Sequence, residues 1–108
     1  MLVLDEVLIR CRVKKSDLRS WIDRDWVRPV QQDGDWRFAE QDVARIELIC
    51  DLVRDLAIDP DALDVILPLV DQVYALRRSL RAVTRAVDAL PADSRRRFLE
   101  HLAERPDG

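Results

Sequence analysis

Hydrophobic residues in the N-terminal part recur at helical spacing in two short segments. The first is an amphipathic turn over residues 4–8, and the second carries Leu18, Trp21 and Ile22 on one face. A break at residues 11–14 separates them. Two short helices joined by about four residues are typical of a helix-turn-helix.

The next segment has the pattern of a β-hairpin. Aromatic and β-branched residues at 26–30 and 36–38 flank a polar stretch that contains Asp33-Gly34, which is a turn signal. Pro29 has no amide hydrogen to donate, so it confines the first strand to an edge. The sequence therefore predicts a small hairpin wing after the two helices.

From Glu40 the hydrophobic period returns to 3.6 and continues through Asp55, which predicts a helix of four turns or more. Asp59 can accept hydrogen bonds from the first amides of a following helix, and Pro60 fits its first position. The apolar side of the helix that begins at Glu40 consists of Val43, Ile46, Ile49 or Cys50, Val53 and Leu56.

Pro68 lies about two turns inside this following helix, where proline costs about 3 kcal/mol unless the helix kinks or restarts. The sequence therefore predicts a short helix to about Leu67 and a long helix from Pro68. After Pro91, which ends the long helix, residues 93–104 offer a last amphipathic turn or two.

The long helix has the most regular pattern of the chain. Its apolar residues alternate steps of three and four, which is the heptad spacing of a coiled-coil seam, and its other faces are charged. A seam this narrow favours a partner helix, so we predict a homodimer, with packing inside the chain as the alternative. An antiparallel pair would bring Asp64 and Asp71 towards arginines at 77–85 of the other chain, but the sequence does not decide the orientation. The seam consists of Ile66, Leu69, Val73, Leu76, Leu80, Val83, Val87 and Leu90.

Composition limits the class of protein. The chain has 108 residues, 48% of them apolar and 36% charged, which describes one small soluble domain. No apolar run approaches the roughly 18 residues of a membrane helix, and no secretory signal is visible, so we expect a cytoplasmic protein.

Chemically reactive residues are few. Cys11 and Cys50 are too few and too far apart for a zinc site or a disulfide framework, and we predict them to be buried apolar side chains rather than redox or metal-sensing residues. His101 is the single histidine and is expected to face solvent. No catalytic set and no glycine-rich phosphate loop can be assembled, so we predict no enzyme, no metal and no cofactor.

Charge is distributed unevenly along the chain. Residues 1–45 hold nine bases and nine acids, residues 46–76 hold seven acids against Arg54 alone, and residues 77–108 hold eight arginines against five acids. The N-terminal third is therefore neutral, and an acidic segment follows it.

Five short segments, in this order, resemble a known group of proteins. They are residues 4–7, 18–22, 26–29, 36–45 and 69–78. Their order is similar to that of MerR-type domains, and the chain resembles the chaperone-modulator branch of that group, the CbpM family, over about residues 2–90.

This resemblance and the periodicity together predict a mainly α fold. Residues 1–58 are expected to form a MerR-like winged helix-turn-helix with a small β-hairpin wing. Residues 59–108 are expected to form a helical extension with a coiled-coil-like dimerisation helix and a short C-terminal helix, packed with the first part as one structural unit.

The resemblance also implies a function. Proteins similar to this one bind the J-domain of a DnaJ-like co-chaperone of the CbpA type and inhibit it by blocking the surface that DnaK needs. Because a J-domain presents a helix rich in lysine and arginine, an acidic surface of helical length would suit it. Spacings of i, i+4 and i+8 place the first three candidates on one stripe, although a merely solvated face is the alternative. The predicted J-domain-binding residues are Glu47, Asp51, Asp55, Asp61, Asp64 and Asp71.

The alternative function is a MerR-like DNA-binding transcriptional regulator, in which the second helix and the wing read DNA. Affinity for DNA needs a clustered basic face, which the neutral N-terminal third lacks. Asp17, Asp33 and Asp35 would repel phosphate, and Arg12 replaces the usual glycine of the turn. In this alternative, DNA contacts would come from Lys14, Lys15, Arg19, Arg24 and Arg37.

Overall fold

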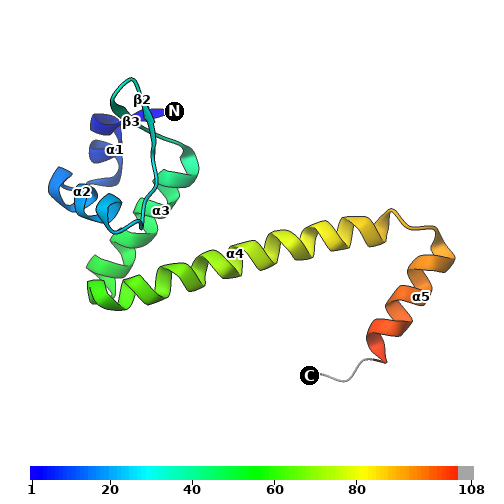
Figure 1. Cartoon of the computed structure of the whole chain (residues 1–108). Helices are drawn as coiled ribbons and strands as arrows, with labels where there is room; N and C mark the ends of the chain where they lie inside the picture. The colour runs from blue at the N-terminus through cyan, green and yellow to red at the C-terminus, as the bar shows by residue number, and fades with distance from the viewer. Residues whose placement is uncertain (105–108) are drawn as a thin grey trace. The chain divides into compact units, whose positions relative to one another are not determined.

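A computed structural model describes residues 1–104, and the chain divides into two compact units, residues 1–68 and 69–108. The first unit contains β1 (Leu2–Val3), α1 (Leu4–Cys11), α2 (Lys15–Asp23), β2 (Val30–Gln32), β3 (Asp35–Phe38), α3 (Glu40–Cys50) and the π-helical turn η1 (Asp51–Asp55) (Figure 1). Helix α4 (Pro60–Asp88) begins in the first unit and continues into the second, which also contains α5 (Ala92–Ala103). The predicted winged helix-turn-helix, long helix and short C-terminal helix are confirmed.

The helix-turn-helix forms because both helices bury their apolar faces in a shared core. Val7 of α1 and Leu18 of α2 are fully buried. Helix α1 ends at Cys11. The next residue, Arg12, adopts a left-handed backbone with φ of 54°, and the Val13 amide donates to the Leu8 carbonyl at 3.2 Å. The turn therefore has the geometry that glycine usually provides, although arginine occupies it.

The wing is a three-stranded antiparallel sheet in the order β1-β3-β2. Val30 pairs with Arg37 across β2 and β3, and Leu2 pairs with Phe38 across β1 and β3. Asp33 and Gly34 both have positive φ, as a two-residue hairpin turn requires. The predicted hairpin and its edge strand are therefore confirmed.

Two details of the predicted wing are wrong. The first strand begins at Val30 rather than Trp26, because Trp26 and Val27 instead enter the core, where they are buried. The third strand, β1, was not predicted, because a strand of two residues carries no periodic signal and forms only by pairing with β3.

One continuous core holds the first unit together. Phe38 is its largest fully buried side chain, and Leu63 and Leu67 of α4 belong to it. The first two turns of α4, which the sequence analysis assigned to the helical extension, therefore pack within the first unit. The core consists of Val7, Cys11, Val13, Leu18, Trp21, Trp26, Val27, Phe38, Val43, Ile46, Ile49, Cys50, Leu63 and Leu67.

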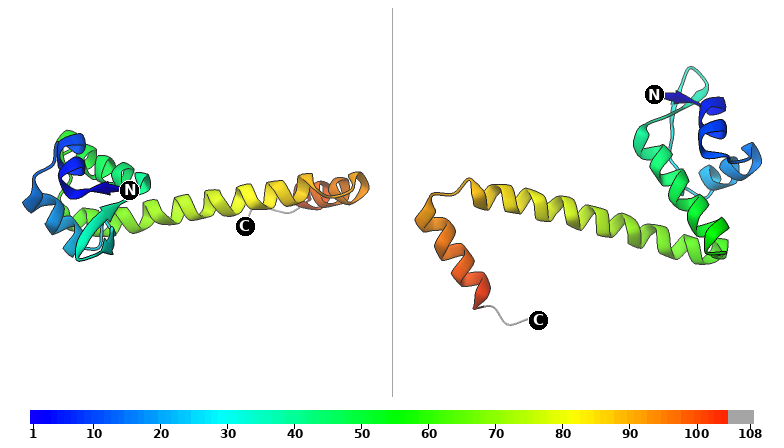
Figure 2. Two further views of the ribbon diagram at one scale, coloured as in Figure 1. Left: turned by 90° about the horizontal axis from the view of Figure 1, so that it is seen from above. Right: turned by 180° about the vertical axis from the view of Figure 1, so that it is seen from behind.

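The predicted helix break at Pro68 is wrong, because this residue lies inside the single helix α4. Figure 2 shows α4 as one uninterrupted ribbon. Pro68 is exposed, whereas Leu63 and Leu67 are buried. Proline removes one backbone hydrogen bond of the helix, and on the exposed side water can satisfy the carbonyl that it leaves free. The start of α4 agrees with prediction, because the Asp59 carboxylate accepts the Asp61 amide at 3.3 Å and Pro60 is the first helical residue.

The end of the α3 segment also differs from a regular helix. Residues 51–55 form the π-helical turn η1, in which the Leu56 amide donates to the Asp51 carbonyl at 3.2 Å, five residues back. This wider turn changes the angular position of the residues that follow. Leu56, which was predicted on the buried side, is consequently 65% exposed.

Ala57, which follows η1, provides a direct test of this helix end. Its φ is +50°, a left-handed conformation that costs a residue with a Cβ atom about 1 kcal/mol or more. Ala57→Gly is therefore expected to stabilise the first unit by about 1 kcal/mol in urea unfolding followed by tryptophan fluorescence. The matched control is Ala44→Gly at an exposed position inside α3, which is expected to destabilise by a similar amount. Equal effects of the two substitutions would contradict the role assigned to the left-handed backbone.

Candidate functional site

The first three predicted docking carboxylates lie on α3 and η1. Glu47 belongs to α3, and Asp51 and Asp55 are the first and last residues of η1. All three side chains are exposed, and none forms a salt bridge with another residue among positions 1–104. We call these three residues the acidic stripe.

The other three predicted carboxylates lie on α4 and differ in their surroundings. Asp64 is engaged within the first unit, because one of its oxygens accepts the indole N–H of Trp26 at 2.7 Å and the other accepts Arg24 at 3.2 Å. Asp61 is exposed in the first turn of α4. Asp71 is exposed and belongs to the second unit.

The basic residues predicted for the DNA-binding alternative also differ in their surroundings. Arg24 is paired with Asp64 and lies over the Trp26 ring at 5.2 Å from its centroid. Arg37 is half-buried in β3 and donates to the Trp36 carbonyl at 3.2 Å. Exposed positions near the start of α2 hold the other three bases, which are Lys14, Lys15 and Arg19.

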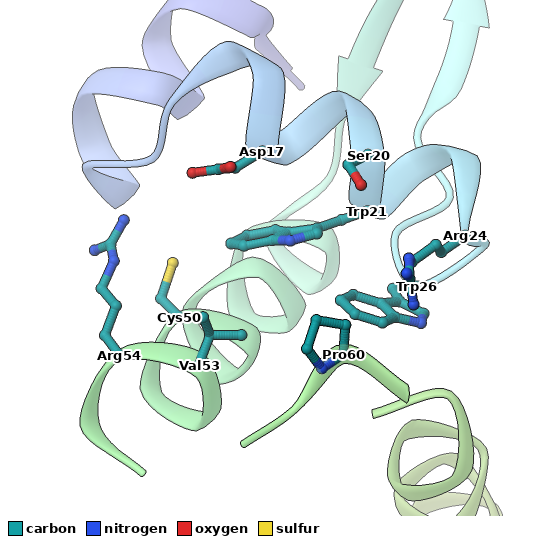
Figure 3. A pocket seen from close by; sticks show the side chains of 9 residues that line it. All are labelled: Asp17, Ser20, Trp21, Arg24, Trp26, Cys50, Val53, Arg54 and Pro60. Carbon is teal, nitrogen blue, oxygen red and sulfur yellow. The ribbon is translucent and has the colours of Figure 1, made fainter. Parts of the chain in front are cut away.

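A groove of about 320 Å³ lies between α2 on one side and η1 with the start of α4 on the other. Figure 3 shows Trp21 in its middle, Arg54 at one end, and Arg24 with Trp26 at the other end. Pro60 and Val53 lie across the groove from α2. Its lining consists of Asp17, Ser20, Trp21, Arg24, Trp26, Cys50, Val53, Arg54 and Pro60.

This groove was not predicted from the sequence. Asp17, Ser20, Trp21 and Arg24 have the spacing i, i+3, i+4 and i+7, which places two charged residues and a tryptophan on one face of α2, and that spacing was the available signal. The opposite wall comes from residues 50–60, and only the fold brings it near α2.

The one charged residue that lines that opposite wall is basic. Arg54 is its single base, and it donates a hydrogen bond to the Arg12 carbonyl rather than to a carboxylate. Four exposed carboxylates occur close to it in the chain, on η1 and around the start of α4. They are Asp51, Asp55, Asp59 and Asp61.

Both cysteines are buried, as predicted, with exposed fractions of 8% for Cys11 and 7% for Cys50. Burial raises the pKa of both thiols, because a thiolate is poorly solvated there. A raised pKa disfavours the reactive thiolate, so neither side chain resembles an activated nucleophile. No cluster of three or more cysteine, histidine or acidic residues within positions 1–104 could hold a metal ion.

The raised thiol pKa values predict how stability depends on pH. Above the ordinary cysteine pKa of about 8.5, the unfolded chain loses thiol protons that the folded chain keeps. The contribution of the thiols to stability is therefore complete below that pH, and it falls as the pH rises towards the folded-state values. The urea midpoint is expected to decrease between about pH 7.5 and 9.5. A Cys11→Ala, Cys50→Ala double variant should show a smaller decrease, and an equal decrease would contradict this explanation.

Apolar side chains of the predicted seam are exposed on the part of α4 that belongs to the second unit. Leu76 is 68% exposed and Leu80 is 65% exposed, and Leu69, Val73 and Val83 are also exposed. Val87 is half-buried. His101 on α5 is exposed, as predicted.

Comparison with known proteins identifies the family of this chain. A model of the MerR HTH family regulatory proteins matches residues 2–85. No curated protein and no solved structure gives a significant match. Among the helices within residues 1–104, none is both long enough and apolar enough to cross a membrane. Since the family model covers the helix-turn-helix, the wing and most of α4, the chain belongs to the MerR helix-turn-helix family of regulatory proteins.

Proposed function

We propose that this protein is a chaperone modulator of the CbpM type, which binds the J-domain of a DnaJ-like co-chaperone and inhibits it. The observation that carries the proposal is the exposed acidic stripe on α3 and η1, beside a helix-turn-helix whose first 45 residues have no net charge. A surface of this sign suits a basic helix of another protein better than a phosphate backbone.

The state of the basic residues supports a protein partner. Nucleic-acid binding depends on several free lysines and arginines on one face. Arg24 is neutralised by Asp64, and Arg37 is half-buried against its own strand. Asp17 also lies on α2, the helix that would enter DNA in a MerR-type reader.

An apolar contact accompanies the acidic stripe. Leu56 follows Asp55 directly and is 65% exposed. Complementary charge mainly raises the association rate and selectivity, so a complex of micromolar affinity also needs apolar surface. Leu56 provides such surface at the end of η1.

Inhibition follows from mutual exclusion. A J-domain uses its basic helix to contact DnaK, as the resemblance to the modulator branch implies. If the same helix lies on the acidic stripe, DnaK cannot reach it. Binding of the modulator and of DnaK to one J-domain is therefore expected to be competitive.

We also propose that the protein is a homodimer, joined through the seam on α4. The seam leaves a line of leucine and valine side chains exposed on the single chain, from Leu69 to Val83. Such a line at heptad spacing is the surface that a second helix covers in a coiled coil.

The second candidate function is a DNA-binding regulator, which the family and the exposed bases at the start of α2 favour. The two functions are distinguished by two parallel titrations, one with an isolated J-domain and one with random duplex DNA at ~150 mM salt, which suppresses weak non-specific contacts. Binding to the J-domain without binding to DNA is the expected result. DNA binding that persists at this salt concentration, with no affinity for the J-domain, would refute the proposal.

Reversing two charges of the acidic stripe tests the docking surface itself. Asp51→Lys with Asp55→Lys is expected to weaken J-domain binding at least about tenfold and to reduce its salt dependence, because two attractive charges become repulsive. The control pair is Asp23→Lys with Asp35→Lys, which makes the same charge change at exposed positions elsewhere in the first unit. The affinity is measured by calorimetric titration, and thermal unfolding confirms that each variant is folded. Equal losses in both pairs would assign the effect to net charge instead of the stripe.

A further inference from the structure

Four arginines form a basic surface on the part of α4 that belongs to the second unit. All four side chains are exposed, and no acidic residue occurs between positions 72 and 87. None of the four guanidinium groups forms a salt bridge or a hydrogen bond with another residue among positions 1–104. We call this set the arginine stripe, and it consists of Arg77, Arg78, Arg81 and Arg85.

The arginine stripe lies away from the proposed seam. With Leu80 at an a position of the heptad, Arg81 follows at b and Arg85 at f. Arg78 is at the preceding f position, and Arg77 is at e. Positions b and f are on the outer side of a coiled coil, so a second helix packed along the seam would leave most of the stripe uncovered. The arginines therefore stay accessible to a further acidic surface.

The acidic stripe of α3 and η1 has the same spacing and the opposite charge. Its three carboxylates follow one another at intervals of four positions, as do the arginines at 77, 81 and 85. Residues four positions apart on a helix lie about 6 Å apart along its axis, so each stripe presents one charge about every turn. We propose that the arginine stripe of one copy of this protein binds the acidic stripe of a second copy.

The charge balance of the chain favours a second copy over nucleic acid as the occupant of the arginine stripe. The net charge of the chain is −3, and residues 46–76 hold seven acids against Arg54 alone, which repels a phosphate backbone. The same acids attract the arginines of another copy. Two copies related by a two-fold axis would make this contact twice, because the arginines of each would face the acids of the other.

The effect of this contact on docking rests on the proposed function. The arginine stripe is a basic helical surface, which is the chemistry proposed for the ligand of the acidic stripe. A second copy bound there would exclude the J-domain, so the protein would limit access to its own docking surface. Exposed ion pairs are individually weak and are screened by salt, so the self-contact is expected to weaken as ionic strength rises.

Carbodiimide cross-linking of mixed copies tests the contact directly. Arg77→Lys with Arg81→Lys keeps both positive charges and introduces amines that carbodiimide joins to neighbouring carboxylates. The control is Arg96→Lys with Arg97→Lys on α5, which makes the same change at exposed positions outside the arginine stripe. Isotope-labelled and unlabelled protein are mixed in equal amounts, and mass spectrometry identifies the joined peptides.

Peptides that join position 77 or 81 of one isotope to the acidic stripe of the other are expected. Their yield at ~50 mM salt should be at least about fivefold higher than at ~500 mM salt, and at least about fivefold higher than in the control. Absence of mixed-isotope products, or an equal yield from the control, overturns the inference. Weaker binding of random duplex DNA by Arg77→Gln with Arg81→Gln, without mixed-isotope products, would assign the stripe to nucleic acid instead.

Calorimetric titration with an isolated J-domain measures the effect on docking. Arg77→Gln with Arg81→Gln is expected to lower the Kd about threefold at ~50 mM salt and to have little effect at ~500 mM salt. Arg96→Gln with Arg97→Gln removes the same charge and should have a smaller effect, and equal effects would overturn the masking of the docking surface. Mixed-isotope products without J-domain binding support the self-contact and refute the proposed function. J-domain binding without such products overturns the self-contact and leaves the proposed function standing.

Discussion

Replacing Leu80 by glutamate is expected to convert the proposed homodimer into a monomer. Leu80 is in the middle of the seam and is 65% exposed on the single chain. A dimer would bury it against a partner helix, where an unpaired carboxylate costs several kcal/mol. The dissociation constant is therefore expected to rise more than about 100-fold, as measured by sedimentation equilibrium.

The control for this variant is Ala82→Glu. It adds the same charge two residues further along, on a different face of α4, where Ala82 is exposed. This variant is expected to remain dimeric. If Leu80→Glu also remains dimeric, or if the unmodified protein sediments as a monomer, the seam does not join two chains.

Replacing Phe38 by alanine is expected to destabilise the first unit strongly. Phe38 is fully buried and is the largest fully buried side chain of the core, at the end of the central strand β3. Its removal leaves a cavity, and buried Phe→Ala substitutions cost about 3–5 kcal/mol. A small domain has about 5–15 kcal/mol of stability in total, so a unit of this size loses a large part of it.

Tryptophan fluorescence measures this effect selectively, because Trp21, Trp26 and Trp36 all lie in the first unit. The urea midpoint should decrease sharply in the Phe38→Ala variant. The matched substitution Phe98→Ala on α5, where the ring is 37% exposed, should leave the tryptophan transition nearly unchanged. Similar midpoints for the Phe38 variant and the unmodified protein would show that the core does not depend on this ring.

The sequence predicted elements well where one face is buried along a long periodic run. The spacing of Leu18 and Trp21 predicted the second helix, and Asp59-Pro60 predicted the start of α4. Both predictions held because helical spacing and capping act between residues that are close in the chain. Prediction failed at Pro68 and Leu56. At Pro68 the cost of the missing hydrogen bond depends on which side of the helix faces solvent, and at Leu56 a π-helical turn shifted the register.

The candidate site also combines features that local spacing indicates with features that only the fold reveals. The spacing of the acidic stripe is visible in the sequence, because its three residues are four positions apart along a helical segment. The engagement of Asp64 is not, since its partners Arg24 and Trp26 are 40 and 38 residues away in the chain. The groove was missed for a related reason, because its two walls come from α2 and from residues 50–60.

The amino-acid sequence was sufficient to predict the order of the helices and the wing, the heptad spacing and the neutral N-terminal third followed by an acidic segment. These features depend on composition and on spacings of a few residues, which act locally. The folded structure was needed to show which charges are already paired, that Leu63 and Leu67 complete the core of the first unit, and that two tryptophans line a groove. Those outcomes depend on long-range packing, in which the free energy of burial determines which distant segments meet.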